Sequence, residues 1–316
     1  MHAAVVNVLG EAPKYQSFPD PEPQAGEALI QVRAVGLHPV VKAIAAGAHY
    51  SSGGSLPAIP GVDGVGALPD GRRVYFGFVS KPWGTMAELA AAPVKWMLTL
   101  PDGLDDVRAA AIANPGMSAL VSLKWRAELQ PGETVLILGA TGVAGQLAIQ
   151  TARLLGAKRV IAAGRNVAAI SAADVDAVIG LAEPEKAIAD ALEKEVAAGI
   201  DIVIDYVWGR PAELTLEALA KGFKPAATRT TRYVEVGSSA GRTITLPAEV
   251  LRSVDLTLKG SGFGSAKLET IFAAVPMLFE QAAAARLTID VEPVPLAGVE
   301  SAWNRIESGR RIVFTV

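Results

Sequence analysis

Residues 134–166 read TVLILGATGVAGQLAIQTARLLGAKRVIAAGRN, and this stretch decides the fold. Thr134–Gly139 is an apolar run of strand length, too short for an independent helix. Gly156 ends the segment that follows, and Arg159–Gly164 is a second apolar run. Between the two runs, apolar residues recur at the spacing of one helical face: Ala144, Leu147, Ala148, Ala152 and Leu155. The stretch therefore predicts a buried parallel strand, a turn, a helix and a second strand.

The turn between strand and helix carries a phosphate-binding pattern. Ala140, Gly142 and Gly145 stand at the spacing of the dinucleotide fingerprint, with alanine in the first glycine position. Such a turn lets a pyrophosphate approach a helix N-terminus, whose free N–H groups and dipole favour an anion. The pattern predicts a nucleotide cofactor held by Ala140, Thr141, Gly142 and Val143.

The end of the second strand indicates which cofactor binds. NAD sites usually place Asp or Glu about 20 residues beyond the glycines, where it binds the ribose 2′-hydroxyl. This chain has Gly164, Arg165 and Asn166 there, and its next carboxylate is Asp174. A guanidinium pairs with a 2′-phosphate, which a carboxylate would repel. We therefore predict NADP(H), with Gly164, Arg165 and Asn166 at the phosphate end.

Composition narrows the class of protein. The 316 residues suffice for two domains with their own cores, and 51% hydrophobic content argues against disorder. The net charge is only −3 and no basic tract occurs, so we expect no nucleic-acid partner. Glycines and prolines interrupt every apolar run, and we expect neither a membrane span nor a signal peptide. The absence of cysteine excludes disulfides and cysteine zinc sites and is compatible with a cytoplasmic location.

Two kinds of segment divide the chain. Residues 1 to about 115 carry short β-like runs between turns, at Ala3–Leu9, Glu27–Val35, Arg72–Phe78 and Val94–Leu100. From about 117 to 257, strands alternate with helices. Further strands are expected at Ala177–Leu181, Ile200–Tyr206, Arg232–Gly237 and Leu256–Gly260. Helices are expected at Pro184–Ala197 and Pro211–Lys221. Six strands with helical crossovers predict a doubly wound sheet. After a helix at Ala266–Ala284, a β-like tail ending at Ile312–Val316 is too small to fold alone, so we expect it on the N-terminal domain.

Four separated motifs also occur in the order of a known family. They are the opening segment with FPDPEPQAGEALIQVRAVGLHP, the turn IPGVDGVG, the element GTMAEL, and LQPGETVLILGATGVAGQLAIQTARLLGAKRVIAA. Over essentially its whole length the chain resembles the medium-chain dehydrogenase/reductase superfamily, in its zinc-free quinone oxidoreductase type. The resemblance implies an α/β protein. A GroES-like β-rich substrate domain (1–117 and 258–316) would accompany a Rossmann NADP-binding domain with a doubly wound parallel sheet (118–257), and the active site would lie between them.

Departures from the family pattern concern the metal. Zinc-dependent relatives have a cysteine near residue 37 and a His-Glu pair in the Pro-Gly turn. Here His38 follows Leu37 in the first region, and Asp63 follows a valine in the second. A catalytic zinc needs three protein ligands, and a set made of His38, His49 and Asp63 would be new to the family. We predict that no metal takes part.

Three residues are candidates for the catalytic proton donor or oxyanion partner. His38 occupies the position of an asparagine that contacts cofactor or substrate in zinc-free relatives; the alternative is a hydrogen-bonded loop histidine. Tyr50 corresponds to a tyrosine that serves as proton donor in related enoyl reductases. The run from Gly47 to Tyr50 is one residue longer than usual, so His49 is a competitor. The alternative for Tyr50 is a structural tyrosine that caps a loop.

The resemblance implies further cofactor contacts. Ser118 keeps a hydroxyl expected on the nicotinamide side. Arg311 resembles the basic residue of the family's terminal segment and is expected near the phosphates, with a solvated arginine as the alternative. The loops after the fifth and sixth Rossmann strands supply the others: Gly237, Ser238, Ser239, Phe263 and Gly264.

Together these features imply hydride transfer from NADPH to a quinone or an α,β-unsaturated carbonyl, a small-molecule substrate. Two alternatives stay open: a crystallin-like nucleotide-binding protein with little catalysis, and a zinc-free alcohol dehydrogenase. Relatives pair through the last Rossmann strand, here Leu256–Ser261, so we expect a homodimer.

Overall fold

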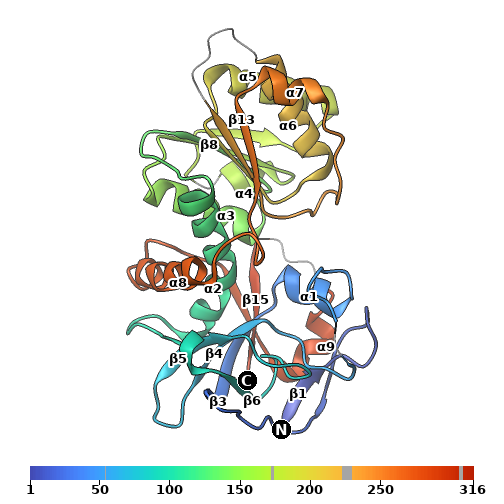
Figure 1. Ribbon diagram of the computed structural model, residues 1–316, viewed down its shortest axis with the longest axis vertical. Helices are drawn as coiled ribbons and strands as arrows, with labels where there is room; N and C mark the ends of the chain where they lie inside the picture. The colour runs from blue at the N-terminus through green and yellow to red at the C-terminus, as the bar shows by residue number, and fades with distance from the viewer. Residues whose placement is uncertain (54, 172–173, 223–229, 306–308) are drawn as a thin grey trace. The chain divides into compact units, whose positions relative to one another are not determined.

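The computed structural model describes residues 1–53, 55–171, 174–222, 230–305 and 309–316. The chain forms two compact units (Figure 1). Unit 1 consists of Met1–Asn114 and Val275–Val316, and unit 2 of Pro115–Ala274. The units divide at 114/115 and 274/275, whereas the domain boundaries predicted from the sequence lie at 117/118 and 257/258. Each unit has its own sheet.

Among the described residues, unit 2 contains six parallel strands in the order β10-β9-β8-β11-β12-β13. Their bounds are β8 (Thr134–Leu138), β9 (Arg159–Gly164), β10 (Ala177–Gly180), β11 (Ile202–Asp205), β12 (Thr231–Glu235) and β13 (Leu256–Gly260). The chain runs from β8 outward to β9 and β10, then returns to the other side for β11, β12 and β13. This confirms the predicted doubly wound sheet. It also puts the topological switch point, where such sheets bind ligands, at the carboxyl ends of β8 and β11.

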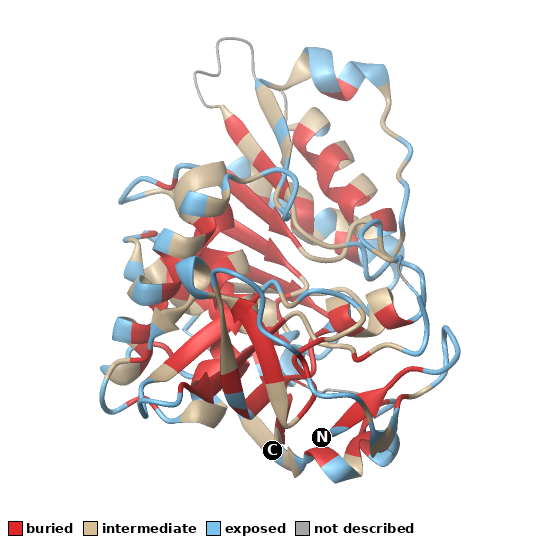
Figure 2. Cartoon of the chain, turned by 60° about the horizontal axis from the view of Figure 1, so that its bottom comes forward, coloured by how far each residue is buried: buried red, intermediate tan, exposed pale blue. Residues whose placement is uncertain are grey.

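Burial explains why these segments are strands. The central strands are almost wholly buried, as Figure 2 shows in red, because helices pack on a parallel sheet and require apolar side chains on both faces. The helices are α3 (Val143–Leu154), α4 (Val167–Ser171), α5 (Glu185–Ala198), α6 (Gly209–Lys221) and α7 (Ala248–Ser253). Strand β13 is at the sheet edge, and its Leu258 is 37% exposed.

Two helices carry the chain from one unit to the other. Helix α2 (Asp106–Leu120) continues into a π-helical turn, η2 (Val121–Arg126), and α8 (Leu268–Ala283) leads back. In the part of the chain that the structure describes, no helix combines the length and the apolar character that a membrane crossing needs.

Unit 1 is rich in β-structure. Its larger sheet has the order β14-β15-β3-β4-β5-β7, with β6 also paired to β3, and β1 pairs with β2. The strands are β1 (His2–Val5), β2 (Lys14–Ser17), β3 (Glu27–Gly36), β4 (Asp63–Ala67), β5 (Arg73–Gly77), β6 (Leu89–Pro93), β7 (Leu98–Thr99), β14 (Val291–Pro295) and β15 (Arg311–Thr315). The helical segments are α1 (Pro39–Ala45), η1 (Val94–Trp96), η3 (Leu296–Gly298) and α9 (Val299–Ala302). Strand β15 pairs antiparallel with β3, so the tail returns to the N-terminal sheet as predicted.

One predicted strand is wrong. Within Val94–Leu100, the first three residues form the turn η1, and only Leu98–Thr99 pair in the sheet, as β7. Pro93 cannot donate a ladder hydrogen bond, and the Met97 N–H closes the turn on the Val94 carbonyl at 3.1 Å.

Three strands were missed in unit 1: β2, β4 and β6. Strand β4 contains glycines, which weaken the strand pattern, and β6 contains a run of alanine, which is depleted in strands. The glycine at position 66 has a packing reason: a Cβ added there would lie 2.4 Å from the Gln31 carbonyl oxygen on β3.

Candidate functional site

The turn after β8 takes its conformation from Gly139. Its φ is +86°, and its N–H and that of Ala140 both donate to the Ala163 carbonyl at 2.9 Å. The Gly142 N–H then donates to the Gly139 carbonyl at 3.1 Å, and Gly142 is the N-cap of α3. The positive φ therefore falls one residue before the first fingerprint position, which explains why alanine is tolerated at that position.

The other two glycines of the turn have different surroundings. A Cβ added at Gly145 would lie 2.3 Å from the Gly139 carbonyl oxygen and 2.7 Å from the Ala140 Cα, so only glycine lets α3 pack this closely. At Gly142, where φ is −75°, the one atom within 4 Å of an added Cβ is that same oxygen, at 3.4 Å. In the described part of the chain, the N-cap residue of α3 makes no side-chain capping hydrogen bond. The turn thus has an open approach to the free N–H groups of a helix N-terminus.

The end of β9 lies against this turn. A Cβ added at Gly164 would lie 2.8 Å from the Thr141 Cγ2, so the predicted residues Thr141 and Gly164 are neighbours. Arg165 and Asn166 follow on the surface. The Asn166 side chain accepts a hydrogen bond at 3.3 Å from the N–H of Ala169 in α4. Arg165 is an exposed cation beside the turn.

The predicted segment after β12 packs on the segment after β11. A Cβ added at Gly237 would lie 3.0 Å from the Tyr206 carbonyl oxygen, and the Ser239 hydroxyl donates to that oxygen at 3.2 Å. Ser238, between them, is exposed. Two of the predicted residues therefore meet at Tyr206, which sequence reasoning did not select.

Ser118 and the loop after β13 complete the predicted cofactor residues of unit 2. Ser118 lies in α2 beside Tyr206: burial raises the pKa of the Tyr206 phenol, and the Ser118 side chain opposes that rise. Phe263 is 41% exposed, and a Cβ added at Gly264 would have no atom within 4 Å. Both belong to an open loop.

In unit 1, His38 belongs to a buried cluster. It is the N-cap of α1 and 1% exposed, and its Nε2 lies 3.2 Å from the Asp63 Oδ1 without the alignment of a hydrogen bond. The Tyr75 hydroxyl donates to the Asp63 Oδ2 at 2.7 Å. Burial and the neighbouring Asp63 raise the pKa of Tyr75 well above its usual value. Asp63 therefore links His38, the residue before α1, to Tyr75 on β5, and the sequence did not reveal this link.

The loop after α1 brings the predicted residues His49 and Tyr50 together. Their ring centroids are 4.0 Å apart, and Tyr50 is 75% exposed. The His49 Nδ1 lies 2.7 Å from the Ser51 hydroxyl, and partial burial lowers the pKa of His49. The Lys81 ammonium holds the loop by donating to the carbonyls of Ser51 and Gly53.

Arg311 lies inside unit 1. It begins β15, is 2% exposed, and donates from its guanidinium to the Leu37 carbonyl at 2.5 Å. This bond ties the tail to the residue before His38. The phosphate contact expected of Arg311 stays a prediction.

Comparison with known proteins decides the family. A quinone oxidoreductase of Sus scrofa is 30% identical over 296 residues, which cover 90% of this chain and 81% of the relative. The chain belongs to the quinone oxidoreductase family. A probable NADPH-dependent quinone reductase of Emericella nidulans is 28% identical over 360 residues and 99% of each chain. The solved quinone oxidoreductase of Thermus thermophilus, also determined in complex with NADPH, is 29% identical with a TM-score of 0.80 over 100% of both chains. A scan against protein-family models finds no match.

Among the described residues, no group of three or more His, Cys, Asp or Glu side chains could hold a metal ion. His38 and Asp63 are close, but they form a pair joined to a tyrosine.

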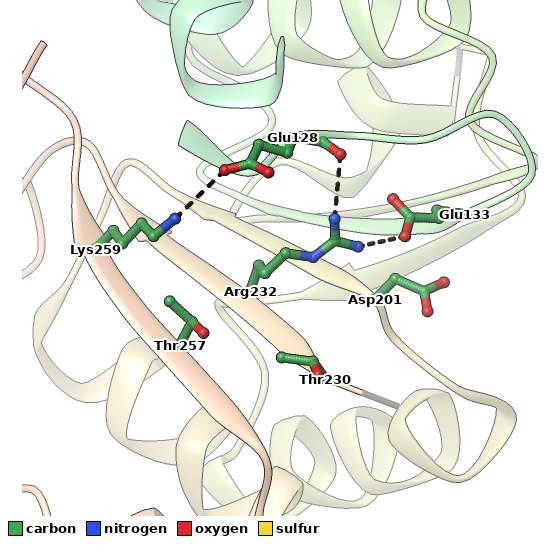
Figure 3. A pocket seen from close by; sticks show the side chains of 7 residues that line it. All are labelled: Glu128, Glu133, Asp201, Thr230, Arg232, Thr257 and Lys259. Carbon is green, nitrogen blue, oxygen red and sulfur yellow. Dashed lines mark hydrogen bonds and ion pairs between the residues drawn. The ribbon is translucent and has the colours of Figure 1, made fainter. Parts of the chain in front are cut away.

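This quinone oxidoreductase chain also has a polar pocket at the amino ends of its Rossmann strands, away from the glycine turn. Figure 3 shows its lining: Glu128, Glu133, Asp201, Thr230, Arg232, Thr257 and Lys259. The Arg232 guanidinium pairs with Glu133 and donates to the Glu128 carbonyl at 3.2 Å, and the Lys259 ammonium lies 3.8 Å from the Glu128 carboxylate. Both cations of the pocket, Arg232 and Lys259, are paired with its glutamates, so the pocket fits a structural junction better than a ligand site.

Proposed function

We propose that this chain is an NADPH-dependent, zinc-independent reductase that transfers hydride to a quinone or an α,β-unsaturated carbonyl. The observation that carries the proposal is the open approach at Gly142 to the uncapped N-terminus of α3, followed by exposed Arg165 where NAD enzymes have a carboxylate. The names of the relatives support the same cofactor and substrate class.

The residues present fit this cofactor. A pyrophosphate would be bound by the N–H groups of the first turn of α3, including that of Val143, because Gly142 has no Cβ in the way. Arg165 would bind the 2′-phosphate through a charge-assisted pair, with Thr141 and Gly164 at its side.

NADPH, when bound, supplies the hydride. The chain itself must orient the nicotinamide and stabilise the negative charge that develops on the substrate oxygen. Ser118 and the loops after β12 and β13 would orient the ring. Tyr50, His49 and His38 are the candidate donors to the substrate oxygen; the Tyr50 phenol is the most exposed of the three.

We also propose a homodimer and a cytoplasmic location. Among the described residues, β13 pairs with a strand on one side only, and its Leu258 is partly exposed; both features favour pairing with a second copy. The lack of cysteine, and therefore of any disulfide, is compatible with a reducing compartment. Zinc independence is supported by the missing cysteine and His-Glu ligands.

The test is turnover by the purified protein. We expect NADPH consumption with members of a panel of quinones and enones. NADPH fluorescence that changes on binding without turnover would favour the crystallin-like alternative. Oxidation of alcohols with NADP⁺, without quinone or enone reduction, would favour an alcohol dehydrogenase. Absence of both binding and turnover would refute the proposal.

A further inference from the structure

The segment after β11 forms one side of the topological switch point. The Tyr206 N–H donates to the Leu138 carbonyl at the end of β8, at 3.1 Å. The turn glycine packs on the same segment: a Cβ added at Gly139 would lie 2.9 Å from the Val207 Cγ1 and 3.2 Å from the Tyr206 Cβ. Tyr206 and Val207 therefore stand opposite the phosphate-binding turn in the crevice where ligands of such sheets bind.

A buried carboxylate holds this segment in place. Asp205 is fully buried; its Oδ1 accepts the N–H groups of Val207 and Trp208 at 2.8 and 2.9 Å, and its Oδ2 accepts the Tyr233 hydroxyl at 2.6 Å. Burial raises the pKa of Asp205, and these hydrogen bonds oppose the rise. Trp208 has a φ of +53°, a conformation that a bulky residue keeps only when its surroundings impose it. Asp205 imposes the path of the chain after β11.

The segment after β12 reinforces the same arrangement. The Ala240 N–H donates to the Val207 carbonyl at 2.7 Å, and the Ser239 hydroxyl donates to the Tyr206 carbonyl. The Tyr206 backbone is thus fixed from β8, from Asp205 and from the β12 loop.

The hydroxyl at the end of that side chain is buried and poorly satisfied. The Tyr206 hydroxyl makes no well-aligned hydrogen bond within the described part of the chain, although Ser118 lies close enough to affect its pKa. A buried hydroxyl without a partner opposes folding, so this hydroxyl needs a specific explanation, such as an ordered water or a bound ligand. With the pyrophosphate at the β8 turn and the 2′-phosphate beside β9, the rest of a dinucleotide extends over β11 and β12. Tyr206 lies on that side.

Building on the proposed NADPH-dependent function, we propose that Tyr206 is a cofactor-binding residue that donates its hydroxyl to the nicotinamide carboxamide, and that Asp205 is its positioning residue. The carboxamide is a neutral primary amide, and its oxygen accepts from a neutral phenol.

The experiment compares two ligands by equilibrium titration. NADPH carries the carboxamide, whereas adenosine 2′,5′-bisphosphate has only the adenosine and 2′-phosphate end. Tyr206→Phe should weaken NADPH about tenfold and leave the bisphosphate unchanged, since a neutral hydrogen bond has about that value. Tyr15→Phe, on β2 of unit 1, is the matched control and should change neither affinity. Equal losses for both ligands, or no loss for NADPH, would overturn the assignment.

The positioning role of Asp205 has its own readout, the preference for NADPH over the bisphosphate. Asp205→Asn should reduce this preference, and Asp205→Asn combined with Tyr206→Phe should reduce it no further than Tyr206→Phe alone. Additive losses would contradict the positioning role. Tyr233→Phe, which removes one partner of Asp205, gives the same test if Asp205→Asn does not fold. A wild-type chain that binds neither ligand would refute the proposed function itself, whereas wild-type binding of both with an unaltered Tyr206→Phe variant would refute only this inference.

Discussion

Gly142→Ala and Gly145→Ala should separate cofactor binding from folding. At Gly145 the new Cβ would stand 2.3 Å from a backbone oxygen, at least 1.1 Å inside the 3.4 Å of ordinary contact, and the backbone of the turn cannot rotate away. Overpacking of this kind costs about 1–3 kcal/mol or more, which lowers Tm by roughly 2–12 °C for a unit of this size. At Gly142 the new Cβ would reach only 3.4 Å contact at a φ of −75°, and the entropy gain of alanine opposes its poorer fit to the N-cap position, so stability should change by less than about 1 kcal/mol.

The two positions should differ in the opposite way in cofactor affinity, where Gly142 is the sensitive one. The Gly142→Ala methyl would occupy the path of the pyrophosphate and should cost about 1–3 kcal/mol of binding, or roughly 5- to 150-fold in affinity. Thermal unfolding and NADPH fluorescence titration of both variants measure the two effects independently. A Gly142→Ala variant that binds NADPH as well as the wild type would refute the location of the pyrophosphate. An unaltered Tm for Gly145→Ala would refute the packing argument.

Three further predictions concern cofactor choice, the proton donor and assembly. Arg165→Ala should weaken NADPH by roughly one to two decades and NADH little; equal losses in titrations with both cofactors would show that Arg165 acts structurally. Tyr50→Phe should slow enone reduction by about 10²-fold and quinone reduction only weakly, because a quinone gains aromatic stabilisation on reduction and solvent can supply its protons. If His49→Ala gives that kinetic pattern instead, His49 is the donor, and if neither does, Tyr50 and His49 are both excluded. Light scattering at micromolar protein should give twice the 32.7 kDa chain mass, and a monomer mass would contradict pairing through β13.

Local patterns could be predicted from the sequence. The unit from Thr134 to Gly164 depends on apolar periodicity and glycine positions within about 30 residues, and its strands and helix formed as expected. The tail strand β15 was also correctly assigned to the N-terminal sheet. Strand β4 was missed, because the reason for its glycines is the close approach of β3, which a local pattern does not contain.

The candidate site shows the same limit. Gly237, Ser239 and Ser118 were selected one segment at a time, but their meeting at Tyr206 depends on the order of strands in the sheet. For the segment that contains Tyr206, the local sequence shows a carboxylate, Asp205, at the end of an apolar run. The Asp63 link between His38 and Tyr75 likewise joins residues brought together by the sheet of unit 1.

The most direct measurement of the central claim is a single turnover. The purified protein is mixed with one equivalent of NADPH and an excess of quinone in a buffer that contains a metal chelator, and NADPH and hydroquinone are followed together. We expect one hydroquinone for each NADPH oxidised, at a rate that falls when the transferred hydrogen of NADPH is replaced by deuterium. NADPH that binds but is not oxidised, or oxidation that the chelator abolishes, would contradict a zinc-independent NADPH:quinone reductase.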